Sequence, residues 1–179
     1  MTARELETYL TLVLADQNPA FAAAHDELYP ERLPERIPLS ITLLYPFATT
    51  TEVDEHLDTL RSFFASHPPF DLEIAGVAQW EESGAVYGVP EPEQPLRDLM
   101  RSLWRLYPQF PPYGEVGADP PPHASLTLSG GEDRAATLER VERRLEGLLP
   151  AKFHISEAAL MEEDEPDRMR LRETFRLGA

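Results

Sequence analysis

The sequence has no cysteine among its 179 residues. Without cysteine, the chain cannot form disulfides, has no thiolate nucleophile and cannot bind a metal through sulfur. Long apolar runs are also missing, because the longest, near residues 9–15 and 41–48, fall far short of the ~20 residues that a membrane span needs. The first residues are acidic and lack the apolar stretch of a signal peptide. We therefore expect a cytoplasmic protein with no membrane partner.

Basic residues are scarce: 16 Lys and Arg stand against 32 Asp and Glu, which gives a formal net charge of −16. Nucleic-acid binding depends on Lys and Arg that neutralise phosphates, so no long nucleic acid is expected as a partner. With 42% hydrophobic and 27% charged residues, the composition is that of an ordinary globular protein. The length suits one domain over residues 1–179, and the sequence favours no particular oligomeric state.

Hydrophobic periodicity predicts strands interleaved with helices, the pattern of an α+β or α/β protein. The tract at 107–122 holds six prolines and two glycines, so we expect a stiff loop there, and long ordered loops are often functional. Strands are predicted at 7–15, 39–45, 70–80, 85–89 and 124–128, with a closing hairpin of 151–161 and 168–177 around an acidic turn at 162–167. Helices are predicted at 19–28, 53–64, 94–106 and 134–149.

Two of these strands carry rows of hydroxyl groups. Residues two apart on a strand share a face, so Ser40 lies beside Thr42, and His123 beside Ser125 and Thr127. Hydroxyls donate hydrogen bonds to phosphate oxygens, and histidine transfers protons near neutral pH, so the pattern suits a small anion. An ordinary solvent-facing strand gives the same pattern.

The two strands also echo one another. The segment SITLL at 40–44 and the segment SLTLS at 125–129 are near copies, each followed by a helix, which hints at two related halves facing each other. A second His-x-Ser, from His154 to Ser156, lies inside a predicted strand of mixed polarity, where a structural role is the simpler interpretation.

Four segments together resemble a known family, the 2'-5' RNA ligase-like bacterial branch of the two-histidine (2H) phosphoesterase superfamily. The segment LSITLLYPF at 39–47 resembles its first signature, H-x-T-L followed by Y-P-F, and PHASL at 122–126 resembles the second, P-H-x-[ST]-L. PPYGE at 111–115 and FRLG at 175–178 resemble further landmarks. The resemblance extends from about residue 7 to the C-terminus.

The resemblance implies two pseudo-symmetric lobes, each a small antiparallel sheet with flanking helices, around a central cleft. It also implies that two histidines act as general base and general acid on a 2',3'-cyclic phosphate or a 2'-5' phosphodiester, with no metal or other cofactor. Residue by residue, His123 matches one catalytic histidine, and Thr42 and Ser125 match the phosphate-binding hydroxyls. Ser40 stands where the family has its other histidine.

The sequence also allows other assignments of the motif register and of the site residues. A different register would align Ser125 and Thr127 with Ser40 and Thr42, leaving no histidine in either motif. His25 could replace the missing imidazole, although an exposed helical histidine explains it as well. The acidic runs at 81–82 and 162–165 could suggest metal ligands, but a solvated turn is the simpler interpretation of four acidic residues in a row.

The expected function is that of a 2H phosphoesterase-like protein that acts on a small phosphorylated molecule. Ser40 and His123 are the expected catalytic pair, and Thr42, Ser125, Tyr45 and Tyr113 the expected substrate-binding residues. Loss of one acid–base partner typically costs ~10²–10⁴-fold in rate, so activity should be reduced. The alternative is an inactive ligand-binding pseudoenzyme, and a third interpretation is a Ser–His nucleophile pair with different chemistry.

Overall fold

The computed structural model describes residues 5–29, 37–129 and 132–178, and in them the chain forms an α+β fold built on one eight-stranded sheet. Every pairing in this sheet is antiparallel, and the strand order is β6-β3-β4-β5-β2-β1-β7-β8. The strands are β1 Thr8–Val13, β2 Ser40–Leu44, β3 Phe70–Gln79, β4 Val86–Glu91, β5 Ala124–Ser125, β6 Ala151–Ile155, β7 Glu157–Glu165 and β8 Arg168–Arg176. The helices are α1 Pro19–Leu28, α2 Leu57–Ala65, α3 Glu93–Leu106 and α4 Arg134–Leu145, with short 3-10 helices at Ala15–Gln17, Val53–His56 and Pro112–Gly114.

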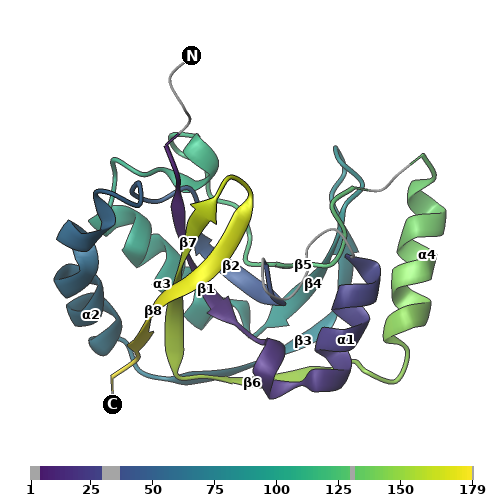
Figure 1. Ribbon diagram of the computed structural model, residues 1–179. Coiled ribbons are helices and arrows are strands. Elements are labelled where there is room, and N and C mark those ends of the chain that lie inside the picture. Colours follow the sequence, from purple (N-terminus) through teal and green to yellow (C-terminus); the bar gives the residue numbers. More distant parts are fainter. Residues whose placement is uncertain (1–4, 30–36, 130–131, 179) are drawn as a thin grey trace.

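The sheet has two halves of four strands that meet at its centre, as the resemblance predicts. The first half is β6-β3-β4-β5, the second is β2-β1-β7-β8, and one residue pair, Ile41 with Ala124, joins them. Helices α1 and α4 lie on one side of the molecule and α2 and α3 on the other (Figure 1). Helix α4 packs against β4 and α1, α3 against β2, and α2 against β8. Both halves bury their apolar faces in the same core cluster.

Residues 151–161 form two strands, not the single strand that the sequence predicts. The strand is interrupted at Ser156, and β6 and β7 lie in different halves of the sheet. Burial alternates along β6, whereas β7 has six consecutive buried residues, from Ala158 to Glu163. The change from a half-exposed strand to a covered strand occurs where the chain passes from one half of the sheet to the other. No Gly or Pro at this point indicates a break in the strand.

Two predictions about charged and polar residues are wrong. Glu162 and Glu163 belong to β7 and are each only 4% exposed, so the acidic run is not a solvated turn. Glu162 is buried because the guanidinium groups of Arg170 and Arg172 on β8 donate hydrogen bonds to its carboxylate. His25 is not exposed either: it is 3% exposed and its ring stacks on Tyr29.

The remaining differences concern where elements begin and end. The segment predicted as one helix from residue 53 begins as the 3-10 turn Val53–His56. Helix α4 ends at Leu145, four residues early, because Gly147 adopts a positive φ of 75° that breaks the helical path. Strand β5 is only two residues long, since the chain leaves the ladder after Ser125.

Gly88 lies in a closely packed part of the sheet, so a substitution there tests the packing. A Cβ added at Gly88 on β4 would lie 2.7 Å from Cγ2 of Ile74 and 3.6 Å from Cβ of Ala124. We expect Gly88→Ala to lower the free energy of unfolding by about 1–3 kcal/mol through overpacking, measured by urea denaturation. Gly76→Ala on β3 is the matched control, because nothing lies within 4 Å of its added Cβ. Equal losses in both variants would contradict the close packing at Gly88.

Candidate functional site

The sheet centre places the two candidate motifs side by side. Because Ile41 pairs with Ala124 in antiparallel register, Thr42 lies opposite His123 and Ser40 lies opposite Ser125. Ile41 and Ala124 are fully buried on one face, so the four flanking residues project from the other face. A local two-fold relation therefore equates Ser40 with His123 and Thr42 with Ser125, the register that the family resemblance predicts.

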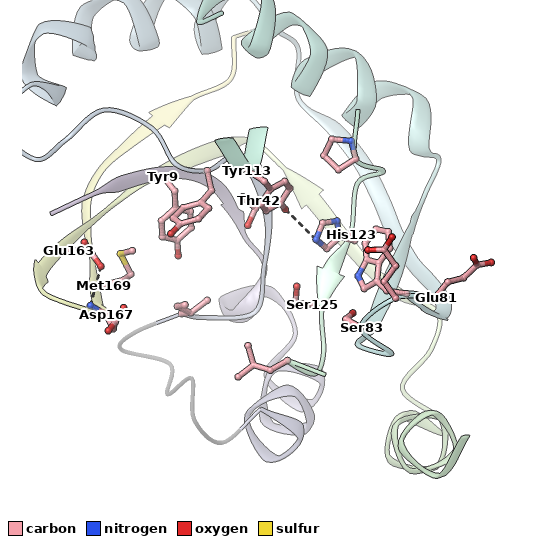
Figure 2. Close-up of a pocket in the computed structure, with 16 residues that line it drawn as sticks. Tyr9, Thr42, Glu81, Ser83, Tyr113, His123, Ser125, Glu163, Asp167 and Met169 are labelled. Atoms are coloured by element: carbon pink, nitrogen blue, oxygen red, sulfur yellow. Dashed lines mark hydrogen bonds between the residues drawn. The ribbon is translucent and has the colours of Figure 1, made fainter. Parts of the chain in front are cut away.

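The face that carries these residues opens into a cavity of about 1150 Å³, lined by Thr42, His123 and Ser125 among others. A volume of this order accommodates a nucleotide-sized ligand. Figure 2 shows Thr42, His123 and Ser125 in the middle of the view, with Glu163, Met169 and Asp167 to one side and Glu81 and Ser83 to the other. The cavity is thus walled by the β7–β8 turn in one half of the sheet and by the β3–β4 turn in the other.

His123 is held in a defined orientation. Its Nδ1 lies 2.8 Å from the carbonyl oxygen of Pro121, which can only accept, so Nδ1 carries a proton. In the neutral ring, Nε2 then has its lone pair available. Burial lowers the pKa of His123 below its ordinary value, and the hydrogen bond to Pro121 partly opposes this. A half-buried imidazole with Nε2 unprotonated near neutral pH is suited to act as a general base.

Aromatic rings surround His123. Trp80 meets the imidazole edge-on, with ring centroids 5.2 Å apart, and Tyr87 does so at 5.8 Å. The Tyr113 hydroxyl lies 3.4 Å from Nε2, the contact drawn as a dashed line in Figure 2. Tyr45, the other tyrosine predicted from sequence, lines the same cavity. Its hydroxyl donates a 3.1 Å hydrogen bond to the carboxylate of Glu7.

Ser40 differs from its neighbours in the motif. It is half-buried, pairs with Val13 of β1 and does not line the cavity, although it lies on the same face of β2 as Thr42. The structure therefore brings Thr42, His123, Ser125, Tyr45 and Tyr113 together around one cavity and leaves Ser40 beside it. All five histidines of the chain lie in the described residues, and His123 is the one that lines the cavity.

Thr127, the centre of the alternative register, serves the backbone instead. Its hydroxyl accepts a hydrogen bond from the Val86 amide at 2.9 Å and donates one to the Ser129 carbonyl at 3.1 Å. Its side chain is 5% exposed and is not part of the cavity lining. The register that pairs Ser125 and Thr127 with Ser40 and Thr42 does not match this placement.

The remaining sequence candidates lie elsewhere or have other roles. His25 lies outside the cavity, buried in α1. Glu81 and Glu82 line the cavity wall, but among the described residues no group of three or more His, Cys, Asp or Glu side chains is placed to hold a metal ion. His154 on β6 is exposed and pairs with Asp71 at 2.6 Å, away from the cavity.

Sequence reasoning missed much of the cavity wall, which includes Tyr9, Trp80, Glu163, Asp167 and Met169. Trp80 ends a predicted strand, and an aromatic residue at a strand end was the only local signal for it. The carboxylate of Glu163 accepts hydrogen bonds from the backbone amides of Glu7 and Asp167. These bonds hold the β7–β8 turn. Such long-range partners leave no mark in the local sequence.

The opposite wall is fixed by helix α4. The guanidinium of Arg134, at the start of α4, donates hydrogen bonds to the carbonyl oxygens of Glu81 and Glu82. The side-chain amide of Gln79 donates in return to the Arg134 carbonyl and to Gly84. The β3–β4 turn is thereby anchored to the helix.

Comparison with known proteins decides the family of the chain. The family model of the 2'-5' RNA ligase superfamily matches residues 12–167. The chain belongs to this superfamily. Its members are 2H phosphoesterases, and the match spans both candidate motifs. Among curated protein sequences, none matches the chain.

Solved structures share the fold of this chain at low sequence identity. A crystal structure titled "phosphoesterase" matches with a TM-score of 0.62 and 15% identity, covering 98% of this chain and 100% of that one. LigT of E. coli in its apo form gives 0.60 and 16%, with 98% and 100% covered. The protein TT0787 of Thermus thermophilus gives 0.57 and 15%, with 96% and 97% covered. No helix in the described part of this chain is long and apolar enough to cross a membrane.

Substitutions at Thr127 and Ser125 distinguish a hydroxyl that stabilises the fold from one that faces the cavity. Thr127→Val removes a buried hydroxyl and leaves the Val86 amide without its partner, so we expect the free energy of unfolding to fall by about 1–3 kcal/mol. Ser125→Ala acts on a cavity-facing side chain and should change it by less than ~0.5 kcal/mol. Urea denaturation measures both. A larger loss for Ser125→Ala would contradict this division of roles.

Proposed function

We propose that the protein is a phosphoesterase with one retained catalytic histidine, which acts slowly on a small phosphodiester or 2',3'-cyclic phosphate. The observation that carries the proposal is the pairing of Ile41 with Ala124, which aligns Thr42, His123 and Ser125 on the floor of one cavity. Crystal structures of E. coli LigT are titled as complexes with 3'-AMP, ATP, NADP+ and phosphate. These small ligands support a ligand of similar size here.

In the proposed reaction, the hydroxyls of Thr42 and Ser125 donate hydrogen bonds to non-bridging phosphate oxygens. His123 Nε2 takes a proton from a water molecule, whose oxygen attacks phosphorus while the bond from phosphorus to the leaving oxygen breaks. The leaving oxygen takes its proton from solvent, because Ser40 is a poor acid and does not line the cavity. The imidazolium then releases its proton, and the products are a phosphomonoester and a free hydroxyl.

The size of the substrate follows from charge. The described cavity lining contains Glu81, Glu82, Glu163 and Asp167 and no Lys or Arg. With a net charge of −16 on the whole chain, a long polyanion is repelled, whereas a ligand with one phosphate group meets the hydroxyls and His123 directly. We propose that the partner is a small phosphorylated molecule and that the protein works in the cytoplasm without a metal cofactor.

A second candidate function, ligand binding without catalysis, is favoured by one observation. No second histidine lines the cavity, although all five lie in the described residues. The same floor of Thr42, His123 and Ser125 would then hold a phosphorylated ligand, and the protein would report or store it rather than cleave it.

Turnover assays test the catalytic role of His123. The purified protein is incubated with 2',3'-cyclic nucleotides and 2'-5' linked dinucleotides, and product formation is followed by chromatography. We expect slow turnover, and we expect His123→Ala to reduce it at least ~100-fold, because the general base is lost. His154→Ala is the matched control and should match the wild type, since His154 is exposed and outside the cavity. Turnover unchanged in His123→Ala would refute the assignment.

Restoring the second imidazole separates the two functions. We expect Ser40→His to raise turnover by ~10²–10⁴-fold, the usual contribution of one acid–base partner. Ser40→Gln provides a side chain of similar size that transfers no proton and should give no gain. If the wild type is inactive and Ser40→His is active, the natural protein is the binding member. If Ser40→His gains no more than Ser40→Gln, position 40 is not the site of the missing acid.

A further inference from the structure

Tyr113 adopts a backbone conformation that tyrosine rarely takes. Its φ of 56° and ψ of 23° lie in the left-handed region, which is unfavourable for a residue with a Cβ. The turn is nevertheless held in place. The Tyr113 amide donates to the Tyr45 carbonyl, and the next two amides, of Gly114 and Glu115, donate to Pro111 and Pro112. The loop is thus built to present this side chain at the cavity.

The side chain is presented to one atom of His123. Since Nδ1 carries its proton toward Pro121, the Tyr113 hydroxyl must be the donor in the 3.4 Å contact with Nε2. Burial raises the pKa of the Tyr113 phenol, so this proton stays in place at neutral pH. The two rings are nearly parallel, at 26°, with centroids 6.4 Å apart. The phenol therefore donates its hydrogen bond to the Nε2 lone pair, which a water molecule or a substrate hydroxyl must reach.

We propose that Tyr113 is a gate over His123: it caps the neutral Nε2 and is released when a dianion, such as sulfate or the phosphomonoester product of the proposed reaction, is bound and His123 holds a proton. This proposal rests on the anion site of the proposed function. A protonated Nε2 is itself a donor, so it cannot accept the Tyr113 hydrogen, and the cap is lost. Tyr113 is 48% exposed, so its ring can leave without disturbing the core.

The charges that face His123 explain why protonation accompanies binding. The groups packed against the ring, Trp80, Tyr87 and Tyr113, are neutral, and the cavity walls add the carboxylates of Glu81, Glu82, Glu163 and Asp167. Among the described lining residues, His123 is the one group able to supply a positive charge. A dianion held by Thr42 and Ser125 stabilises that charge and keeps on Nε2 the proton that it takes from water in the proposed reaction.

Nuclear magnetic resonance of the imidazole nitrogens tests the cap directly. In the empty protein, we expect Tyr113→Phe to raise the pKa of His123 by about half a unit, because the hydrogen bond that favours the neutral ring is removed while the aromatic ring stays. Tyr45→Phe is the matched control, since the Tyr45 hydroxyl bonds to Glu7, and it should titrate like the wild type. A pKa that is the same in Tyr113→Phe and wild type would overturn the gate.

Sulfate tests the coupling, because it stays dianionic from pH 5 to 9. Binding of one proton with the anion requires the dissociation constant to rise by about tenfold per pH unit above the pKa of the free histidine and below that of the bound one. Isothermal titration calorimetry in buffers of different ionisation enthalpy should show proton uptake. Saturable binding with no pH dependence, or no binding at any pH, would overturn the coupling. Turnover plays no part in either experiment, so an inactive protein that shows both effects refutes only the catalytic proposal.

Discussion

One residue pair joins the two halves of the sheet. Ile41 and Ala124 form the ladder contact between β2 and β5, and both are fully buried. Strand alternation then decides the direction of every neighbouring side chain, since a shift of one residue would turn Thr42, His123 and Ser125 into the core. The buried apolar pair thus fixes the polar floor: the hydrophobic effect on one face of the sheet sets the chemistry on the other.

Local patterns predicted most of the elements and the identity of the floor. Alternation correctly gave the shared faces of Ser40 with Thr42 and of His123 with Ser125, because burial of alternate residues is written in the sequence itself. The prediction that Thr127 shares the face of Ser125 is wrong, because β5 ends at Ser125 and Thr127 is buried outside the cavity. The echo between SITLL and SLTLS aligned Ser40 with Ser125, whereas the structure relates Ser40 to His123 across the central pair. The similarity of the two segments pointed to the wrong alignment. It matches Thr127 to Thr42, but the Thr127 hydroxyl accepts a hydrogen bond from the Val86 amide.

The failures share a cause, which is that contacts between separate elements decided them. Glu162 looks like a solvated residue until Arg170 and Arg172 approach from β8 and satisfy its carboxylate. Ser156 carries no turn signal, yet the chain there crosses from one half of the sheet to the other. Trp80 and Glu163 reach the cavity only because two hairpin turns close over it from opposite halves. No periodicity within one segment encodes such meetings.

The anchoring of the β3–β4 turn by Arg134 links the cavity to the outside of the molecule. Helix α4 is tied at its other end to α1, where Arg144 forms a bidentate ion pair with Glu27. Glu81 and Glu82 at the cavity wall are therefore connected through α4 to Glu27 on α1, which does not line the cavity.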